Sequence, residues 1–138
     1  MKLIIINGPN LNLIGKREPE LYGNKPFDYY LDTLRGLYKE FTIDYYQSNI
    51  EGEIIDKIHA AEGKYDGIIL NAGGFTHTSI AIADAISSIK TPVVEVHITN
   101  ILARGPERRR SVIAKNCKGV IMGFGLDSYR LAVESLRL

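Results

Sequence analysis

The sequence predicts an α/β fold in which helices cover both faces of a five-stranded parallel sheet. Four apolar runs lack polar alternation, which is typical of strands buried on both faces: 3–6, 67–70, 92–96 and 119–123. Segments with helical periodicity separate these runs. Because strand–helix alternation joins parallel strands through right-handed crossovers, the helices are expected on both sides of the sheet. The length of 138 residues suits one core, so we expect a single domain over 1–138.

The first half of the chain supplies two of the helices and an edge strand. Helical periodicity predicts a helix at 27–40, and the weaker apolar pattern at 41–47 is typical of an edge strand. Ser48, with Glu51 three residues later, has the spacing of a capping box. This spacing predicts that a second helix begins here and runs over 49–62.

The second half supplies the remaining helices. One is expected at 79–89, with Thr76 and Thr78 as candidate N-terminal caps. The last helix is expected at 126–138, with an apolar face made of Leu131, Ala132, Val133, Leu136 and Leu138. Five strand–helix units of this length fit a flavodoxin-like three-layer sandwich with strand order 2-1-3-4-5.

Composition narrows the setting in which the protein works. A net charge of +1 gives no indication of a nucleic-acid partner, and none is expected. The single cysteine, Cys117, cannot form an internal disulfide, so we expect a cytoplasmic location and a small core residue at this position. The first residues are typical of a strand and not of a signal peptide. No apolar stretch approaches the roughly 18 residues of a membrane span, so no membrane partner is expected.

Polar residues follow three of the predicted strands at the same edge of the sheet. The strands end in Asn-Gly-Pro-Asn at 7–10, Asn-Ala-Gly-Gly at 71–74 and Glu-Val-His-Ile-Thr-Asn at 95–100. In open parallel sheets, ligands bind outside the carboxyl ends of the strands. Asn and Gly after one strand can simply form a turn. Three such runs together, one with a histidine, favour a ligand site.

The connection at 8–26 is much longer than the usual βα loop of roughly 2 to 6 residues, and long loops are either functional lids or disordered. Length alone leaves both interpretations open. Tyr22 within this connection could act as a base, because Lys16 and Arg17 supply positive charge that would favour its phenolate. An exposed tyrosine in a solvated, charged loop is the alternative.

Glu95 and His97 lie two residues apart on one strand, so their side chains share a face. The carboxylate could orient the imidazole, and a structural core histidine is the alternative. His77 is expected to form hydrogen bonds, because neither histidine has partners at metal-ligand spacing; no metal site is predicted. Arg108 could reach a site after this strand, although a basic run such as this one is often a solvated face.

Other ligand-binding classes are weighed by the motifs that they need. No GxGxxG follows the first strand and no GxxxxGK[ST] occurs, which argues against dinucleotides and nucleoside triphosphates. A phosphoryl-accepting module would need acidic residues where Asn7 and Asn71 stand. A flavin-binding module would need a Ser/Thr-rich loop after the first strand, where this chain has NGPNLNLIG.

Four stretches, in order along the chain, resemble type II 3-dehydroquinate dehydratase: INGPNLNLIGKREPELYG, YYQSNIEGEIIDKIHAA, ILNAGGFTHTSIAIADAI and VEVHITNILAR. The resemblance covers essentially the whole chain. It implies a flavodoxin-like subunit of a homo-dodecamer, built as a tetramer of trimers. It also implies conversion of 3-dehydroquinate to 3-dehydroshikimate without a metal, a Schiff base or another cofactor. This hydro-lyase reaction serves either the shikimate pathway of aromatic amino acid biosynthesis or the breakdown of quinate.

The resemblance also implies a role for individual residues. The connection at about 8–26 would be a mobile lid, in which Tyr22 would remove the C2 proton and Arg17 would favour its phenolate. Asn10 would hold a water against the developing oxyanion, and His97, oriented by Glu95, would protonate the departing C1 hydroxyl. The implied substrate contacts are Asn71, His77, Asp84, Ile98, Thr99 and Arg108. Among these, the backbone amides at 98 and 99 would bind the substrate carboxylate, and the residue at 84 would act from a neighbouring subunit.

Two departures from the family pattern concern the segment after the fourth strand. The family usually has serine where Thr99 stands, a change that preserves the hydroxyl. In ARGPERRRS, at 103–111, the family pattern has two acidic residues and a phenylalanine before the arginine. The substrate contact is therefore assigned to Arg108 with Arg109 as the alternative, and Arg104 is a second candidate cation near the lid.

Overall fold

The computed structural model describes residues 1–16, Glu20 and 25–137. Within this part of the chain, five parallel strands form one sheet in the order β2-β1-β3-β4-β5. The strands are β1 (Lys2–Asn7), β2 (Thr42–Gln47), β3 (Gly67–Asn71), β4 (Val93–His97) and β5 (Gly119–Met122). The predicted α/β class, the strand order and the edge position of the second strand are confirmed.

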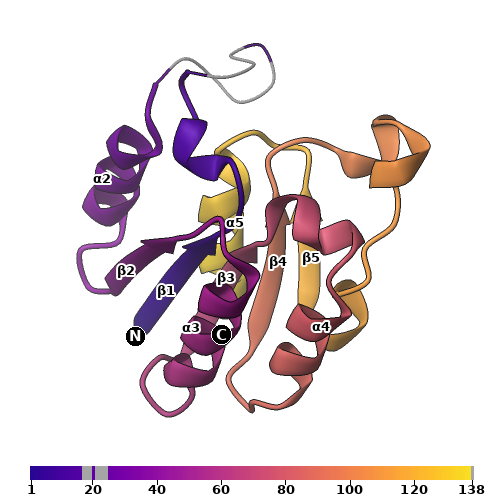
Figure 1. Ribbon diagram of the computed structural model, residues 1–138. Helices are drawn as coiled ribbons and strands as arrows, with labels where there is room; N and C mark the ends of the chain where they lie inside the picture. The colour runs from indigo at the N-terminus through magenta and orange to yellow at the C-terminus, as the bar shows by residue number, and fades with distance from the viewer. Residues whose placement is uncertain (17–19, 21–24, 138) are drawn as a thin grey trace.

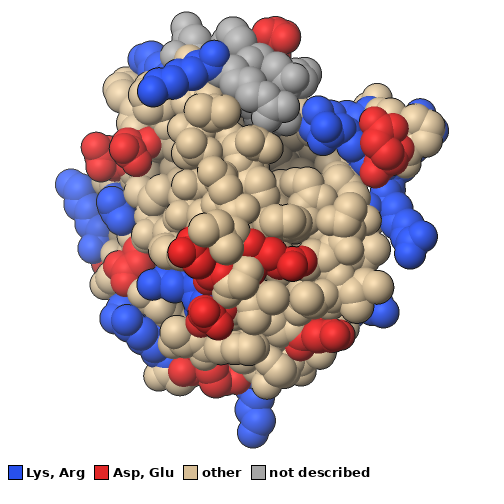
Figure 2. Space-filling model, viewed as in Figure 1, with Lys and Arg blue, Asp and Glu red and all other residues tan. Residues whose placement is uncertain are grey.

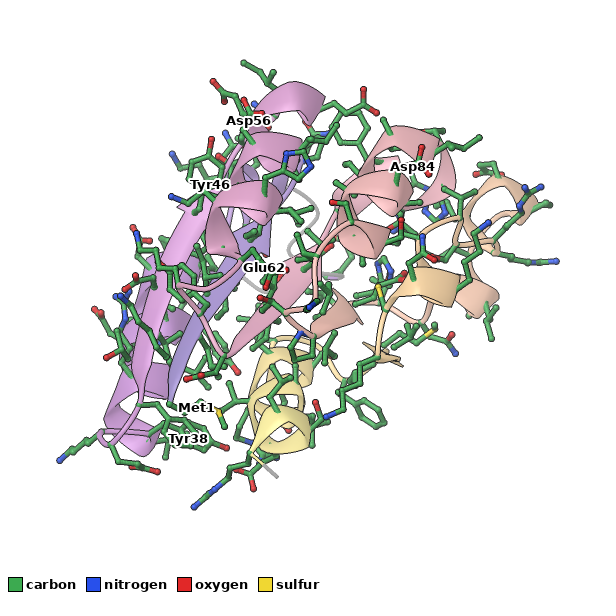
Figure 3. The ribbon with its side chains drawn as sticks, turned by 90° about the horizontal axis from the view of Figure 1, so that it is seen from below. Met1, Tyr38, Tyr46, Asp56, Glu62 and Asp84 are labelled. Atoms are coloured by element: carbon green, nitrogen blue, oxygen red, sulfur yellow. The ribbon has the colours of Figure 1, made fainter. Side chains whose placement is uncertain are left out.

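Helices cover the two faces of the sheet, as Figure 1 shows. They are α2 (Phe27–Leu37), α3 (Glu51–Ala61), α4 (Ile80–Ser87) and α5 (Asp127–Leu136). One core cluster joins α2 and α5 to one face, and a second joins α3 and α4 to the other. In the view from below, α3 and α4 lie on one side of the strands and α5 on the opposite side (Figure 3). The chain therefore forms three layers, as predicted.

The apolar runs form these strands because both sides of the interior strands are covered. On β1, Leu3 and Ile5 face the α2–α5 cluster, whereas Ile4 and Ile6 face the α3–α4 cluster. The prediction of two covered faces is wrong for β5, where Val120 is 37% exposed. This strand lies at the edge of the sheet and is largely exposed or half-buried.

The predicted capping box at Ser48 and Glu51 does not form. The helix α3 begins only at Glu51, after Ile50 as the N-cap in extended conformation. The Ser48 hydroxyl accepts from Ile50 N at 2.9 Å and donates to Glu53 at 2.6 Å. Glu51 instead accepts a hydrogen bond from Ser79 at 2.5 Å, so a contact distant in sequence replaces the local one.

The helix α4 is capped by Ser79, whose side chain accepts from Ile82 N, and not by the predicted threonines. Thr76 lies inside a 3₁₀ turn, η2 (Gly73–His77), and Thr78 ends this turn. The insertion of η2 moves the helix start beyond both threonines.

The outer helices also differ from the sequence prediction. The helix α2 ends at Leu37, before the predicted position 40. On α5, Tyr129 is buried although it was not assigned to the apolar face, while Leu131 is only half-buried. Leu138 lies outside the described residues. None of the helices that the structure describes is long and apolar enough to cross a membrane.

Short turns extend the carboxyl ends of β1, β3 and β4, at the top of Figure 1. They are η1 (Leu11–Leu13), η2, η3 (Ile101–Ala103) and η4 (Pro106–Arg108). The chain leaves β1 close to the exit from β3, because a Cβ atom at Gly8 would lie 2.5 Å from the Ala72 carbonyl oxygen. Only glycine permits this approach. The ends of β1 and β3 are thus held close together at this edge of the sheet.

Candidate active site

A cavity lies at the carboxyl ends of β1, β3 and β4, where the sequence predicted a ligand site. It contains residues from each of the three polar runs after these strands. The predicted site residues that line it are Asn10, Asn71, His77, His97, Ile98, Thr99 and Arg108. Leu11 and Ile14 add an apolar wall.

His97 and Glu95 form a hydrogen-bonded pair at the end of β4, on the shared strand face that their spacing predicted. His97 Nε2 lies 2.5 Å from Glu95 Oε2. Glu95 is fully buried and His97 is 5% exposed, so water does not compete for this contact. Because the carboxylate accepts and Nε2–H donates, Nδ1 is the ring nitrogen left to exchange a proton with a ligand.

Ser111 holds the other oxygen of Glu95. Its hydroxyl donates to Glu95 Oε1 at 2.9 Å and accepts from Ala114 N at 3.1 Å, at the start of η5 (Ala114–Asn116). Burial, and secondarily the charge of Glu95, raises the pKa of the nearby Cys117 thiol to about 12. Cys117 is half-buried and packs against the core, close to the predicted role.

Asn10 has an exposed, left-handed backbone conformation with a φ of 69°. Its backbone N–H donates to Asn49 Oδ1 at 3.0 Å. Gln47 Nε2 donates to the same oxygen and to the Gly8 carbonyl oxygen, both at 3.1 Å. The side chains of residues 47 and 49 therefore hold the backbone around Asn10. The Asn10 side chain itself forms no capping hydrogen bond to the turn that follows it.

Asn71 ends β3 and is nearly buried beneath the cavity. Its Nδ2 donates to the Tyr129 hydroxyl at 2.9 Å, and its Oδ1 accepts from Gly73 N at 3.2 Å. Each amide atom thus has one partner within the protein and retains capacity for a second hydrogen bond to a ligand.

The end of β4 presents backbone donors to the cavity. The carbonyl oxygen of Ile98 accepts from Gly125 N at 3.0 Å. In contrast, the N–H groups of Ile98 and Thr99 donate to no backbone carbonyl in the described residues. Two adjacent amides of this kind suit an oxyanion or a carboxylate.

Basic side chains gather beside the cavity. Figure 2 shows them at the upper right, over the connection after β4. Arg108 lines the cavity, whereas Arg109 Nε donates to the Arg104 carbonyl oxygen at 3.0 Å. Arg104 also lines the cavity and donates to the Thr99 hydroxyl at 3.5 Å. His77 Nδ1 lies 2.7 Å from the Arg110 carbonyl oxygen, which leaves Nε2 for a ligand.

Two predicted site residues that the structure describes do not line this cavity: Glu95, which is bonded to His97, and Asp84. Asp84 is exposed on α4, on the side away from the strands (Figure 3), where it lines a separate hollow with Arg110. Arg17 and Tyr22 lie outside the described residues, as does part of the expected lid at 8–26. In the rest of the chain, no three His, Cys, Asp or Glu side chains are grouped as metal ligands would be.

Sequence reasoning missed the residues that hold the predicted ones in place. These are Ser111 behind Glu95, Asn49 and Gln47 beside Asn10, and Tyr129 beneath Asn71. Their partners lie between 2 and 58 residues away, and no spacing rule links such positions. The only signal was indirect, because Gln47 and Asn49 belong to one of the stretches that resemble a known family.

The comparisons with known proteins agree with one another. The sequence profile described as "Dehydroquinase class II" matches residues 1–137. The chain is 49% identical to 3-dehydroquinate dehydratase of Pelodictyon phaeoclathratiforme, over 99% of this chain and 91% of the relative. It is also 49% identical to the Anoxybacillus flavithermus enzyme of that name, over 99% and 93% of the two chains.

A solved structure extends this similarity to the fold. The type II dehydroquinase of Butyrivibrio crossotus superimposes with a TM-score of 0.96 at 42% identity, covering 100% of this chain and 98% of that one. Sequence and fold thus point to one family. The chain belongs to the class II dehydroquinases.

Proposed function

We propose that this protein eliminates water from 3-dehydroquinate to give 3-dehydroshikimate, as a hydro-lyase of the shikimate pathway or of quinate breakdown. The observation that carries the proposal is the buried Glu95–His97 pair, which opens onto the same cavity as Asn10, Asn71 and the amides of residues 98 and 99. A proton donor, an oxyanion-stabilising side and a carboxylate-binding side are three of the features that this elimination uses, beside a base for the C2 proton.

The acid step is assigned to His97. When the C1–O bond breaks, the departing hydroxyl takes a proton from Nδ1 of the imidazolium and leaves as water. Glu95 holds the opposite ring nitrogen at 2.5 Å and so fixes the ring in the orientation for this transfer. The electron pair of the former C2–H bond completes the C1=C2 double bond, which is conjugated with the C3 carbonyl.

The base step is assigned from the sequence to Tyr22, with Arg17 favouring its phenolate. Removal of the C2 proton places negative charge on the C3 oxygen as an enolate. Asn10 is assigned to hold a water against this oxygen, and its exposed side chain at the cavity supports that role. Each proton transfer in this scheme uses a protein side chain, and no metal or imine takes part.

The substrate contacts follow the chemistry of the cavity. The amides of Ile98 and Thr99 bind the carboxylate, because they have no backbone acceptor within the described residues. Asn71, His77 and Arg108 bind the ring hydroxyls, since each lines the cavity.

Assembly and location belong to the same proposal. The chain forms a homo-dodecamer as a tetramer of trimers in the cytoplasm, and Asp84 reaches the cavity of a neighbouring subunit. Its exposure on α4, outside the cavity of its own chain, supports this assignment. Sedimentation equilibrium measures the assembly directly, and a monomer that is fully active would contradict the role of Asp84.

A cofactor-free assay tests the proposed reaction. Purified protein is mixed with 3-dehydroquinate, and the ultraviolet absorbance of the conjugated enone product is followed. Parallel samples contain a chelator or protein treated beforehand with borohydride in the presence of substrate. We expect product in every sample, because neither a metal nor a lysine imine is used. Folded protein that forms no product would overturn the proposed function, and loss of activity in one treated sample would overturn the cofactor-free mechanism.

A further inference from the structure

A buried polar link joins α5 to the floor of the cavity. The side chain of Tyr129 is fully buried, and its hydroxyl lies between the residues that end β1 and β3. It donates to Asn7 Oδ1 at 2.8 Å and accepts from Asn71 Nδ2 at 2.9 Å. We propose that Tyr129 is a positioning residue that fixes the Asn71 amide for substrate binding. This inference rests on the proposed role of Asn71 as a substrate contact.

The hydrogen bonds of the link determine which way the Asn71 amide faces. The single hydroxyl proton of Tyr129 is used on Asn7 Oδ1, so toward Asn71 the hydroxyl oxygen can only accept. This requires the NH₂ group of Asn71 on the Tyr129 side and its oxygen on the side of Gly73 N, at 3.2 Å. A rotated amide would place NH₂ against an N–H donor. The second N–H and the second lone pair of Asn71 then have fixed directions for a ligand.

Burial makes this arrangement hard to replace. Tyr129 and Asn7 are fully buried and Asn71 is 3% exposed, so water cannot take over a missing partner without opening the core. Burial also raises the pKa of Tyr129 far above its ordinary value, which keeps the hydroxyl protonated as a donor. Asn7 is held in turn by Tyr45, whose hydroxyl accepts from Asn7 Nδ2 at 3.4 Å.

The aromatic ring has a separate role from the hydroxyl. It packs edge-on against Phe27 with a centroid distance of 4.9 Å and lies 6.2 Å from the ring of Tyr30. Replacement by phenylalanine keeps these ring contacts and removes only the oxygen. The variant Tyr129→Phe therefore separates the positioning role from the packing role.

Steady-state kinetics of Tyr129→Phe test the inference. We expect KM for 3-dehydroquinate to rise about 10-fold while kcat stays within about twofold, because Asn71 contacts a part of the substrate that the reaction leaves unchanged. A purely structural residue would lower the amount of folded enzyme and leave KM of the folded fraction at the wild-type value.

Tyr38→Phe is the matched control. The Tyr38 hydroxyl also donates a hydrogen bond, to Glu134 on α5 at 2.8 Å, but Glu134 does not line the cavity as Asn71 does. Loss of the Tyr38 hydroxyl should leave KM unchanged. A wild-type KM in Tyr129→Phe, or an equal rise in both variants, would overturn the inference.

A double substitution separates this inference from the proposed role of Asn71. Asn71→Ala should raise KM by itself, and adding Tyr129→Phe should raise it no further, because Tyr129 acts through Asn71. Additive effects would overturn the positioning role alone. A wild-type KM in Asn71→Ala would overturn the substrate contact and the inference with it. If Tyr129→Phe does not fold, Asn7→Leu removes the acceptor that orients the hydroxyl, and a wild-type KM there overturns the link.

Discussion

The two sides of the proposed site are built in different ways. On the acid side, Glu95 is fully buried within β4 and uses one carboxylate oxygen on His97 and the other on Ser111. On the opposite side, Asn10 is exposed, and its backbone is held by the side chain of Asn49, which is also exposed. The core therefore fixes the acid, whereas an exposed side chain, that of Asn49, fixes the residue assigned to the enolate water.

This difference predicts how far turnover falls when one contact is removed on either side of the site. A buried polar group without its partner keeps the full penalty of desolvation, whereas an exposed group regains a water. Substitutions on the acid side should therefore reduce turnover more than substitutions around Asn10. The predictions that follow test this order, beginning with the largest effect.

Glu95→Gln should reduce kcat by about 100- to 1,000-fold, in the range expected for loss of a positioned general acid. An amide has only one oxygen, so it cannot accept from both His97 and Ser111 as the carboxylate does. KM should change little, because Glu95 does not line the cavity. Steady-state kinetics measure both constants.

Glu62→Gln is the control for this substitution. The Glu62 carboxylate also accepts two hydrogen bonds, from Lys90 N and the Thr91 hydroxyl, but near the amino end of β4 (Figure 3). We expect wild-type turnover in this variant. Equal activity in the two variants would show that the acid side does not depend on the Glu95 carboxylate.

Ser111→Ala should reduce kcat by about 10-fold, close to the value of one hydrogen bond to a charged group. It leaves Glu95 Oε1 without its donor while His97 stays bonded to Oε2. Ser111→Thr keeps the hydroxyl and should restore most of the rate. Ser135→Ala, which removes a bond to the Ala132 carbonyl oxygen on α5, should have no kinetic effect. A rate loss shared by Ser135→Ala would indicate general destabilisation instead.

The fold could be predicted from the sequence because apolar runs, long helical segments and polar strand ends are each visible in a short stretch of sequence. The strand order followed from the flavodoxin-like arrangement that fits five strand–helix units, and the gathering of Asn71 and His97 followed from their places at strand ends. The Glu95–His97 contact was also predictable, because side chains two residues apart on a strand project from the same face of the sheet.

The errors at the helix caps and on α5 arose where a distant partner replaced a local one. Glu51 was assigned to cap its own helix, but it bonds Ser79, and Ser79 in turn caps α4 in place of the two threonines. Tyr129 was left outside the buried face of α5 because its partners, Asn7 and Asn71, lie on other elements. Such contacts appear only once the chain is folded.

Asn49→Ala should reduce kcat by about threefold, because the lost bond to Asn10 N is exposed and water replaces part of it. Asn49→Asp is the matched variant. Asn49 Oδ1 only accepts, from Asn10 N and from Gln47 Nε2, so a carboxylate preserves both bonds. The Asp variant should therefore retain wild-type kcat. If kcat fell further in Asn49→Ala than in Ser111→Ala, the expectation that the acid side is the more sensitive one would be wrong.

Cys117 should contribute nothing to turnover, although it lies near Glu95 on the acid side of the site. Burial and the Glu95 charge raise its pKa to about 12, so the thiolate fraction at neutral pH is about 1,000-fold below that of an ordinary cysteine. Alkylation by iodoacetamide should be slow in the folded protein and fast after unfolding in guanidinium. Cys117→Ser should keep kcat within about twofold, because the thiol makes only a weak 3.5 Å contact with the Ile113 carbonyl oxygen. Rapid labelling of the folded protein would show that the acid side is open to solvent, which would remove the physical basis for expecting larger losses there than around Asn10.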